Sequence, residues 1–552
     1  MNTRSRTKIF NISVKAALRR SPEMALKSMY QEISSLHAKK VFKGVHPSQI
    51  ESRKIIKSFC FLKDKYTSTG TFDKLKARLV AGGHMQDRSE VLFEDVSSPT
   101  SALQHLLLVA TIAAKEGRVV KTVDFTSAYL NADMSDKKIL VELDPIMSAL
   151  LVTVDSSYAP YLRKNGSMVV ELQKALYGCI ESAKRWYDLL ASTLKNEGFQ
   201  VNPHDECVFN KLVDGVQITI VVYVDDLFIS CKDENIIKNL VGNLRSHFAE
   251  LTVHDGITHS YLGMTFDFSI EKSVKVTMER YIRDLLLEAE INTSTKTPAT
   301  DKLFDTRECE KLDAEKSKRF HTLVAKLLYL AKRVRPDILL AVSFLTTRVT
   351  SPDVDDFSKL QRILTYLYGT QDFGIVLRAD TPTRVQTYID ASFGVHGDGK
   401  SHSGLFLTTG SGPIMVKSSK QHIVTKSSTE SELVALSDFT SDAIACRNFL
   451  IAQGELSSPA LIFQDNQSTI ALVNNGMSKN DRTRHINVRY FWTKERIDIG
   501  EIEVKYLPTE DMIADILTKP LQGIKFIQLR ACLLNWPTAV DLAGCVEETE
   551  SE

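Results

Sequence analysis

The sequence predicts a multidomain fold in which α+β and α/β units follow one another. A chain of 552 residues is too long for one hydrophobic core and corresponds to about three to four domain-sized units. Hydrophobic residues make up 43% of it and charged residues 25%, which are ordinary values for globular proteins. Segments with the periodicity of strands and of helices alternate along most of the chain. These three observations together favour several mixed domains.

The N-terminal half is predicted to begin with a basic, irregular leader over residues 1–21. Pro22, at a first helical position after Ser21 as a candidate N-cap, predicts a helix over residues 22–36. The next expected elements are strands at 55–62 and 74–81, an apolar helix at 102–114 and a strand at 118–123 that ends at Asp124.

The C-terminal half has two expected boundaries. The polar segment 300–320 predicts a linker, and helical patterns resume over 321–349 and 357–368. Strand patterns begin again near Arg384. We therefore expect a first domain at 22–299, a linker and helical connection at 300–383, a second domain at 384–522 and a C-terminal tail at 523–552.

Charge and cysteine usage narrow the function classes. Residues 1–88 hold 19 Lys and Arg against 6 Asp and Glu, although the whole chain has a net charge of only +1. Such a block is typical either of a solvated segment or of a face that binds a polyanion. The eight cysteines include no C-x-x-C pair, which argues against a zinc site and fits a reducing compartment. The longest apolar run is too short to span a bilayer, so we expect a soluble protein without a membrane partner.

The stretch VVYVDDLFIS, residues 221–230, places Asp225 and Asp226 at the expected tip of an apolar hairpin. A solvated turn is one interpretation, because Asp is a common turn residue. Two-residue hairpins, however, favour Gly or Asn where φ is positive, and neither is present. A divalent metal site is the alternative, because adjacent carboxylates repel one another and their oxygens suit Mg²⁺. This stretch alone leaves both interpretations open.

Asp124 ends a strand about a hundred residues earlier, in VKTVDFTSAYLN. A helix N-cap is the ordinary interpretation of a single Asp there. A strand-end Asp together with a hairpin Asp pair, however, is the arrangement that two-metal polymerase chemistry requires. Two further blocks accompany it, namely the basic KLKARLVAGGHMQD at 74–87 and VELQKALYGCIESAKRWY at 170–187.

These four blocks resemble the reverse transcriptase of copia-type LTR retrotransposons. That family has a KARLVAKG-like fingers block, a VKNAFLNG-like palm motif, an ALYGLKQ-P-R-W block and YVDD, in the same order. The resemblance implies a right-hand polymerase with fingers, palm and thumb over residues 22–299. It also implies the roles of individual residues: metal ligation by Asp124, Asp225 and Asp226, a grip on the triphosphate by Lys76 and Arg78, contact with the deoxyribose by Tyr129, and the floor of the nucleotide pocket at Gly178.

Two positions depart from the family pattern. Ala183 replaces the Pro of the third block, and Gly83 stands where a bulkier residue is expected. These departures bear on fidelity and rate rather than on the type of reaction.

A second acidic set follows in the order strand, helix, strand, helix: Asp390, Glu432, Asp465 and Asp515. Each has a structural alternative. Glu432 completes a capping box with Thr429, Asp465 could cap the next helix, and Asp515 could lie on an exposed face of a helix over 507–521. Four acids in this order fit the two-metal nuclease site of an RNase H fold.

This second block also resembles the copia-type family, through YIDASF, SSTESEL, QDNQSTIAL and PTEDMIADILTKPL. The resemblance implies that the four acids are metal ligands, with Glu432 favoured over Glu430. The segment KNDRTRHINVRYFWTKER, residues 479–496, is basic and aromatic, and about half of such segments are amphipathic surface. It is a candidate grip on the hybrid backbone through Arg482, Arg484 and Arg489. His485 is either a phosphate contact or a core histidine.

The resemblance implies an RNA-directed DNA polymerase with RNase H activity and two Mg²⁺ ions at each site, with Mn²⁺ as the alternative ion. The implied partners are an RNA template, a DNA primer, the RNA–DNA hybrid and dNTPs, with integrase or other Pol products as further candidates. The implied location is a cytoplasmic virus-like particle with later nuclear entry. The oligomeric state is left open.

Two other functions are alternatives to a reverse transcriptase with RNase H activity. A decayed or domesticated copy would bind nucleic acid without catalysis, but all seven expected ligands are present. A DNA-templated repair polymerase with an unrelated nuclease has no support, because both blocks point to one family. The sequence lacks a protease Asp-Thr/Ser-Gly, an integrase His/Cys signature and a nucleocapsid knuckle, so we expect the C-terminal part of a longer Pol or a truncated copy.

Overall fold

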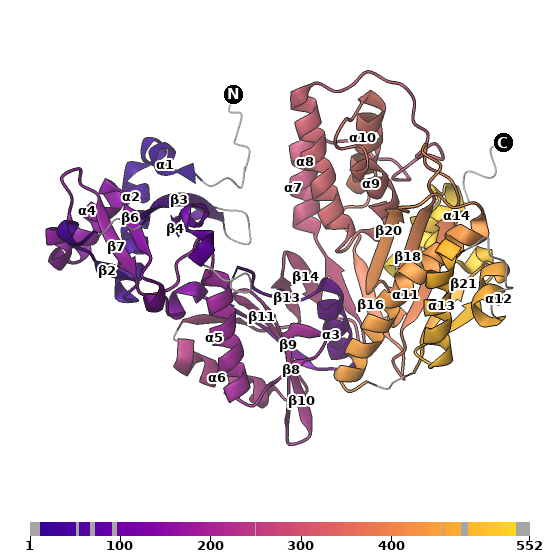
Figure 1. Ribbon diagram of the computed structural model, residues 1–552, viewed down its shortest axis with the longest axis horizontal. Coiled ribbons are helices and arrows are strands. Elements are labelled where there is room, and N and C mark those ends of the chain that lie inside the picture. Colours follow the sequence, from indigo (N-terminus) through magenta and orange to yellow (C-terminus); the bar gives the residue numbers. More distant parts are fainter. Residues whose placement is uncertain are drawn as a thin grey trace.

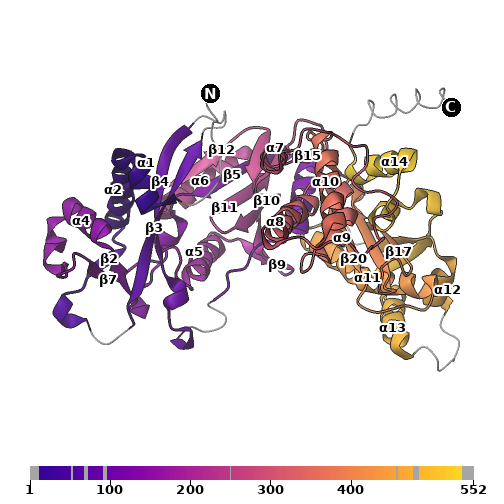
Figure 2. The same cartoon turned by 90° about the horizontal axis from the view of Figure 1, so that it is seen from above.

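The computed structural model describes residues 12–50, 54–66, 72–90, 96–248, 250–455, 458–475 and 484–536. The sheet of the N-terminal strands lies at one end of the long axis of the molecule and the sheet of β17, β18 and β20–β22 lies toward the other end (Figures 1 and 2). No helix in these ranges has both the length and the apolar character needed to cross a membrane.

The first unit is a sheet covered by helices. Its strand order is β1-β3-β6-β7-β2, with β4 paired to β3. The elements are β1 (Ile12–Ser13), α1 (Val14–Arg20), α2 (Pro22–Ala38), β2 (Phe42–Gly44), β3 (Ile56–Tyr66), β4 (Phe72–Ala81), β6 (Leu140–Leu143), α4 (Pro145–Val154) and β7 (Met168–Leu172). The expected irregular leader is wrong for residues 12–20, because α1 is helical and buries Ala17. Ser21 precedes α2 but makes no side-chain capping hydrogen bond.

The second unit is a sheet of order β12-β5-β11-β10-β9-β8. It contains α3 (Leu103–Glu116), β5 (Val119–Phe125), α5 (Ser182–Asn196), β8 (Gln200–Asn202), β9 (Asp205–Val213), β10 (Val216–Tyr223), β11 (Asp226–Cys231), α6 (Glu234–Phe248) and β12 (Leu251–His254). Side chains of β10 alternate between its faces: Ile220 and Val222 pack with α5 and α6, whereas Val221 packs with α3. This alternation buries the strand on both faces.

A third sheet joins segments that lie far apart in the chain, in the order β13-β14-β15-β16-β19. Its strands are β13 (Thr258–Tyr261), β14 (Met264–Asp267), β15 (Val274–Thr277), β16 (Ile375–Ala379) and β19 (Gly410–Ser411). The expected boundary at residue 384 cuts through this sheet, because β19 pairs with β16.

The helices beside the third sheet are α7 (Glu279–Ala289), α8 (Ala314–Ala331), α9 (Leu339–Thr346) and α10 (Val354–Tyr368). Helix α8 begins inside the expected linker, so that prediction is wrong after residue 313. The predicted helix over 321–349 is interrupted at Pro336, where a buried ion pair between Arg335 and Asp337 (2.7 Å) fixes the turn. In Figure 1, the first unit and the helices α7 and α8 both lie above the second sheet.

The fourth sheet has the order β20-β18-β17-β21-β22. Strands β17, β18 and β20 are antiparallel, whereas β21 and β22 continue parallel to β17. The elements are β17 (Gln386–Ser392), β18 (His402–Thr408), β20 (Met415–Lys420), α11 (Ser428–Ala452), β21 (Ala460–Gln464), α12 (Gln467–Asn475), α13 (Arg484–Asp498), β22 (Ile502–Tyr506), the 3₁₀ turns η10 (Thr509–Asp511) and η11 (Ile513–Leu517), and α14 (Gly523–Leu534).

Two sequence predictions fail in this last unit. The helix expected over 507–521 is replaced by η10 and η11, because Pro508 and the extended Met512 interrupt it. Residues 523–534, expected to belong to the C-terminal tail, form α14, which packs on the last unit and buries Phe526, Leu529 and Leu533.

One hydrophobic core connects the second unit to the last one. Buried residues of α3 belong to the same cluster as those of α8, β17 and α11. At this junction the ring of His105 stacks on Phe449 at 4.1 Å, and Lys115 pairs with Glu455 at 3.0 Å. The two acidic sites described next therefore lie in units that are packed against each other.

Two candidate acidic active sites

Strand pairing brings the first three acids together. Strands β5 and β11 are antiparallel, with Asp226 directly opposite Asp124. Asp225 lies in the two-residue turn between β10 and β11, and its carbonyl accepts a hydrogen bond from the N–H of Phe125 (3.0 Å). All three aspartates are partly buried. The backbone ladder, rather than any side-chain contact, sets their proximity.

The turn that carries Asp225 is strained. Val224 has φ +57°, a left-handed conformation that is unfavourable for a β-branched residue. The buried indole of Trp186 donates a hydrogen bond to the Val224 carbonyl (2.6 Å) and holds it in place. A two-residue turn is therefore present although neither of its residues is Gly or Asn, and its positive φ falls on a valine. Strain of this kind persists where surrounding contacts over-determine it, and it is typical of functional turns.

Asp124 does not cap a helix. Strand β5 continues through it to Phe125, and the next helical turn, η5 (Ala128–Asn131), begins only after Ser127 at φ +59°. The N-cap alternative is therefore wrong. The carboxylate is left available at the end of the pleated strand.

Electrostatics at this site favour a cation. Burial, and then the charges of Asp225 and Asp124, raise the pKa of Asp226 to about 6. Burial and the charge of Asp124 also raise the pKa of Asp225, while Arg78 and Lys76 oppose that rise. Crowded carboxylates that resist ionisation are what a divalent cation would stabilise. The chemistry of these carboxylates therefore fits a divalent cation.

The basic strand β4 contributes both predicted fingers residues. The guanidinium of Arg78 lies 4.9 Å from the ring centre of Tyr177, and Tyr177 in turn lies 4.7 Å from the ring of Tyr129. Burial and then nearby Asp225 raise the pKa of Tyr129. Arg78, Tyr177 and Tyr129 thus form a row of contacting side chains between β4 and the aspartates. Lys76 is partly buried, and its pKa is lowered by burial and then by Arg78.

Sequence reasoning missed three residues at this site. Tyr177 joins Arg78 to Tyr129, and Trp186 holds the strained turn. Glu32 on α2 accepts a hydrogen bond from the N–H of Leu79 (3.0 Å) and lies 4.0 Å from Arg78. Tyr177 and Trp186 lie within the quoted third block and were visible there as aromatics. Glu32 gave no signal, because its role depends on α2 packing against β4.

Gly83 and Gly178 pack against each other. A Cβ at Gly83 would lie 2.0 Å from the Gly178 carbonyl, and one at Gly178 would lie 2.2 Å from the Ala81 carbonyl. Gly178 also has φ +90°. The expectation of a bulkier residue at position 83 is therefore wrong for this fold. Both glycines permit the loop at 177–178 to approach β4, where the N–H of Ala81 bonds to the Tyr177 carbonyl at 2.7 Å.

The second acidic site lies at one edge of the fourth sheet. Ligand oxygens of Asp390, Glu432 and Asp465 all lie within 4.8 Å of one another. Strands β17 and β21 are parallel, so Asp390 on β17 and Asp465 just after β21 meet at the same edge. Glu432 reaches them from the first turns of α11. Burial raises the pKa of Asp390 to about 6. The charge of Lys519 opposes this rise, and the charge of Asp515 adds to it. Burial and then Asp390 raise the pKa of Glu432 well above its usual value.

The capping alternatives for these acids are wrong. The N-cap of α11 is Ser427, which accepts a hydrogen bond from the N–H of Glu430. Glu430, in turn, accepts from the N–H of Lys426 at 2.7 Å, which separates its role from that of Glu432. Asn466, rather than Asp465, accepts from the N–H of Thr469 at the start of α12. Asp465 instead accepts from the Thr509 hydroxyl at 2.9 Å.

Asp515 is neither exposed nor part of the three-acid group. It is 1% exposed, on η11, and pairs with Lys519 (2.6 Å) and Lys525 (3.0 Å). Lys519 also lies 3.4 Å from Asp390. Asp515 is therefore connected to the other acids through a lysine.

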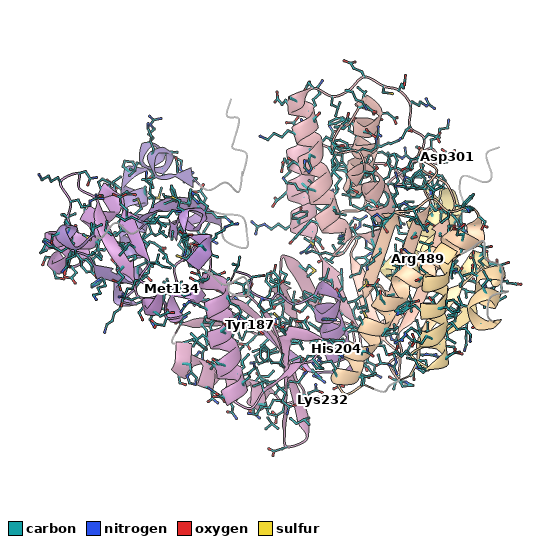
Figure 3. The ribbon with its side chains drawn as sticks, in the orientation of Figure 1. Met134, Tyr187, His204, Lys232, Asp301 and Arg489 are labelled. Atoms are coloured by element: carbon teal, nitrogen blue, oxygen red, sulfur yellow. The ribbon has the colours of Figure 1, made fainter. Side chains whose placement is uncertain are left out.

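The predicted basic grip is described only in part. Arg482 lies outside the described residues, as do the side chains of Arg484 and His485 at the start of α13. Arg489 is described (it is labelled in Figure 3), and it forms an ion pair with Asp438 of α11. Its charge is thus partly committed to a neighbouring helix.

The segment that carries the first site is similar to a known family. Residues 40–301 match the family described as reverse transcriptase (RNA-dependent DNA polymerase). The matched segment contains all three aspartates of the first site.

Relatives of the chain are retrotransposon polyproteins. It is 29% identical over 467 residues to the "Retrovirus-related Pol polyprotein from transposon RE1" of Arabidopsis thaliana, covering 84% of this chain and 30% of that protein. It is 26% identical over 511 residues to the corresponding polyprotein from transposon TNT 1-94 of Nicotiana tabacum, covering 91% and 37%. The predicted likeness to copia-type Pol is confirmed, and the chain spans about a third of the length of these relatives.

A solved structure has the same overall fold. The foamy viral protease-reverse transcriptase dRH, in complex with ds DNA, aligns with a TM-score of 0.50 at 14% identity, covering 92% of this chain and 72% of that one. The predicted multidomain polymerase fold is confirmed at the level of architecture.

Gly83→Ala should disrupt the junction between β4 and the loop at 177–178, because its Cβ has no room beside the Gly178 carbonyl. We expect a lower melting temperature and weaker nucleotide binding. Gly242→Ala, in the middle of α6 with nothing within 4 Å of its Cβ, is the matched control and should be neutral or stabilising by up to about 1 kcal/mol. Equal melting temperatures for the two variants would contradict the packing argument.

The metal-free protein should lose stability as pH rises through 6. Because the folded pKa of Asp226 (about 6) lies above its unfolded value, the folded state holds this proton more tightly. The ionised carboxylate of Asp226 lowers the free energy of unfolding. This loss is absent at low pH, where Asp226 is protonated, and is fully present above pH 6. Melting curves in EDTA from pH 5 to 7.5 should therefore show a flatter dependence for Asp226→Asn than for the unsubstituted chain. Mg²⁺ should raise the melting temperature of the unsubstituted chain at pH 7.5, and parallel curves for the two proteins would contradict this origin.

Proposed function

We propose that this chain is an RNA-directed DNA polymerase that also cleaves the RNA strand of RNA–DNA hybrids. The observation that carries the polymerase function is the pairing of Asp226 with Asp124 inside a reverse transcriptase domain, with Asp225 in the adjoining turn. The relatives' names and the family description support the same reaction.

At the polymerase site, Asp124, Asp225 and Asp226 would hold two divalent ions, with Mg²⁺ preferred and Mn²⁺ as a substitute. When bound, such a pair activates the attacking oxygen and stabilises the leaving one. Arg78 and Lys76 already act on the pKa of Asp225, so they are placed to contact the negative charge of a triphosphate. The charge of Asp225 acts on the pKa of Tyr129 after burial does, which supports a contact between Tyr129 and the sugar of the same nucleotide.

At the second site, Asp390, Glu432 and Asp465 would hold the metal for RNA cleavage. Support comes from the converging carboxylates and from the sheet, in which an antiparallel trio is extended by two parallel strands. Asp515 is held next to them through Lys519. Phosphodiester cleavage by two divalent ions needs a clustered acid set of this kind.

The partners proposed for the chain are an RNA template, a DNA primer, the hybrid that they form, and dNTPs. Other Pol products, including integrase, and a location in a cytoplasmic virus-like particle with later nuclear entry belong to the same proposal. A nucleic-acid-binding protein without catalysis is less well supported, because the acids of both sites are present and placed together.

The two activities should be separable by single substitutions. Asp225→Asn removes a charge from the polymerase site and Asp390→Asn one from the nuclease site. Because the sites lie in different units, each change should abolish one activity and leave the other within about tenfold. The measurements are primer extension on poly(rA)/oligo(dT), with Mg²⁺ and with EDTA, and cleavage of a labelled RNA–DNA hybrid. Loss of both activities from one change in a folded protein would overturn the two-site proposal.

Tyr129 should discriminate against ribonucleotides. Its ring is partly buried, packs against two hydrophobic cores and lies against the ring of Tyr177. This position is compatible with a residue that excludes ribonucleotides and with a residue that only packs. If it is a gate, Tyr129→Val should admit UTP while dTTP incorporation stays largely intact. If it only packs, the variant should lose about 3–5 kcal/mol of stability and both substrates should suffer equally. Incorporation efficiencies for dTTP and UTP with a melting curve decide between them, and Tyr187→Val on α5 is a control aromatic.

A further inference from the structure

Lys519 connects two carboxylates of the nuclease site that do not otherwise share a partner. Its ammonium lies 2.6 Å from Asp515 Oδ1 and 3.4 Å from Asp390 Oδ1. Both aspartates are almost completely buried, whereas 37% of the lysine side chain is exposed. The lysine thus enters the acidic site from its rim.

The fold fixes Lys519 in this place. The residue opposite Asp390 on β18 is Gly404, and a Cβ there would lie 2.7 Å from the Thr518 methyl and 3.0 Å from Leu517 Cβ. The absence of a side chain at Gly404 lets the end of η11 lie directly on the sheet. Thr518 then donates its hydroxyl to the other oxygen of Asp390, and Lys519 follows as the next residue.

We propose that Lys519 is a positioning residue that acts as a built-in cation of the nuclease site and makes the site bind divalent ions in two unequal steps. This inference rests on the proposed nuclease function. The first ion binds among Asp390, Glu432 and Asp465, whose oxygens already converge. A second ion that uses Asp515 must first displace the ammonium of Lys519.

Charge and geometry support the order of these steps. A second divalent ion between Asp390 and Asp515 would take the place now held by a positive charge within 3.4 Å of both carboxylates. At such separations cations repel one another strongly even at an effective dielectric constant of about 20, which disfavours a second ion while Lys519 stays in place. Displacing Lys519 is feasible because its side chain is long and partly solvated.

Lys525 provides a matched comparison. It pairs with the other oxygen of Asp515 (3.0 Å) and is similarly exposed, but within the described part of the chain its ammonium pairs with Asp515 and not with Asp390. Removing Lys525 removes a charge from Asp515 without opening the space between the two aspartates. Its loss should therefore affect ion binding less than the loss of Lys519.

The test is calorimetric titration of Mn²⁺ into a chain in which Asp124, Asp225 and Asp226 are replaced by Asn, so that the nuclease site dominates the signal. This background should bind one ion and a second at least about tenfold more weakly. Lys519→Met and Lys519→Gln should both tighten the second ion by about tenfold or more. Lys519→Arg should behave like the background, and Lys525→Met should change the second constant by no more than about threefold. Melting curves confirm that each variant is folded.

The outcomes separate this inference from the function on which it rests. If Asp390→Asn abolishes binding but both neutral Lys519 variants give the background isotherm, the site binds metal and Lys519 does not act as its cation. If the background binds no ion that Asp390→Asn removes, the metal-dependent nuclease proposal itself fails. An equal effect of Lys519→Met and Lys525→Met would show general electrostatics rather than a specific bridge, and would also overturn the inference.

Discussion

Repulsion between carboxylates held side by side by backbone pairing is the constraint on which both candidate sites depend. The antiparallel ladder of β5 and β11 places Asp124 and Asp226 opposite each other whether or not their charges are compensated. The parallel ladder of β17 and β21 does the same for Asp390 and Asp465. Burial first, and then the charges of neighbouring carboxylates, raise the pKa values of Asp226 and Asp390, so ionisation is costly at both sites.

The two sites differ in where their positive charge comes from. At the polymerase site the cations that act on Asp225 belong to β4, in another unit of the chain. At the nuclease site Lys519 belongs to the same short segment as the acid it pairs with. Arg78 and Lys76 can offset the charge of Asp225 only if β4 is held close to the aspartates. The close contact between Gly83 and Gly178 fixes the position of β4. The first site is therefore sensitive to packing between units, and the second mainly to its own sheet.

Much of this arrangement could be predicted from sequence, because hydrophobic period and acidic strand ends are local signals. The helix from Pro22, the strands around VVYVDDLFIS and the order of the acids all have such signals. Features set by distant contacts could not be predicted in this way. The need for Gly83 arises from a carbonyl almost a hundred residues away, and the burial of Asp515 depends on how η11 lies on β18. The capping alternatives failed for a related reason, since Ser427 and Asn466 cap those helices in place of the acids.

The continuous core between the second and last units bears on how the sites could work together. Helix α3 packs beneath β10 and β11, the hairpin that carries Asp225 and Asp226, and its His105 stacks on Phe449 near the end of α11. The same α11 carries Glu432 at its other end. Helix α11, which is 25 residues long, therefore extends from the junction with the second unit to the edge of the fourth sheet that carries the three-acid group. Packed helices rather than a flexible linker thus set the distance between the two acidic sites, and under the function proposed above this distance favours RNA cleavage at a defined spacing behind synthesis.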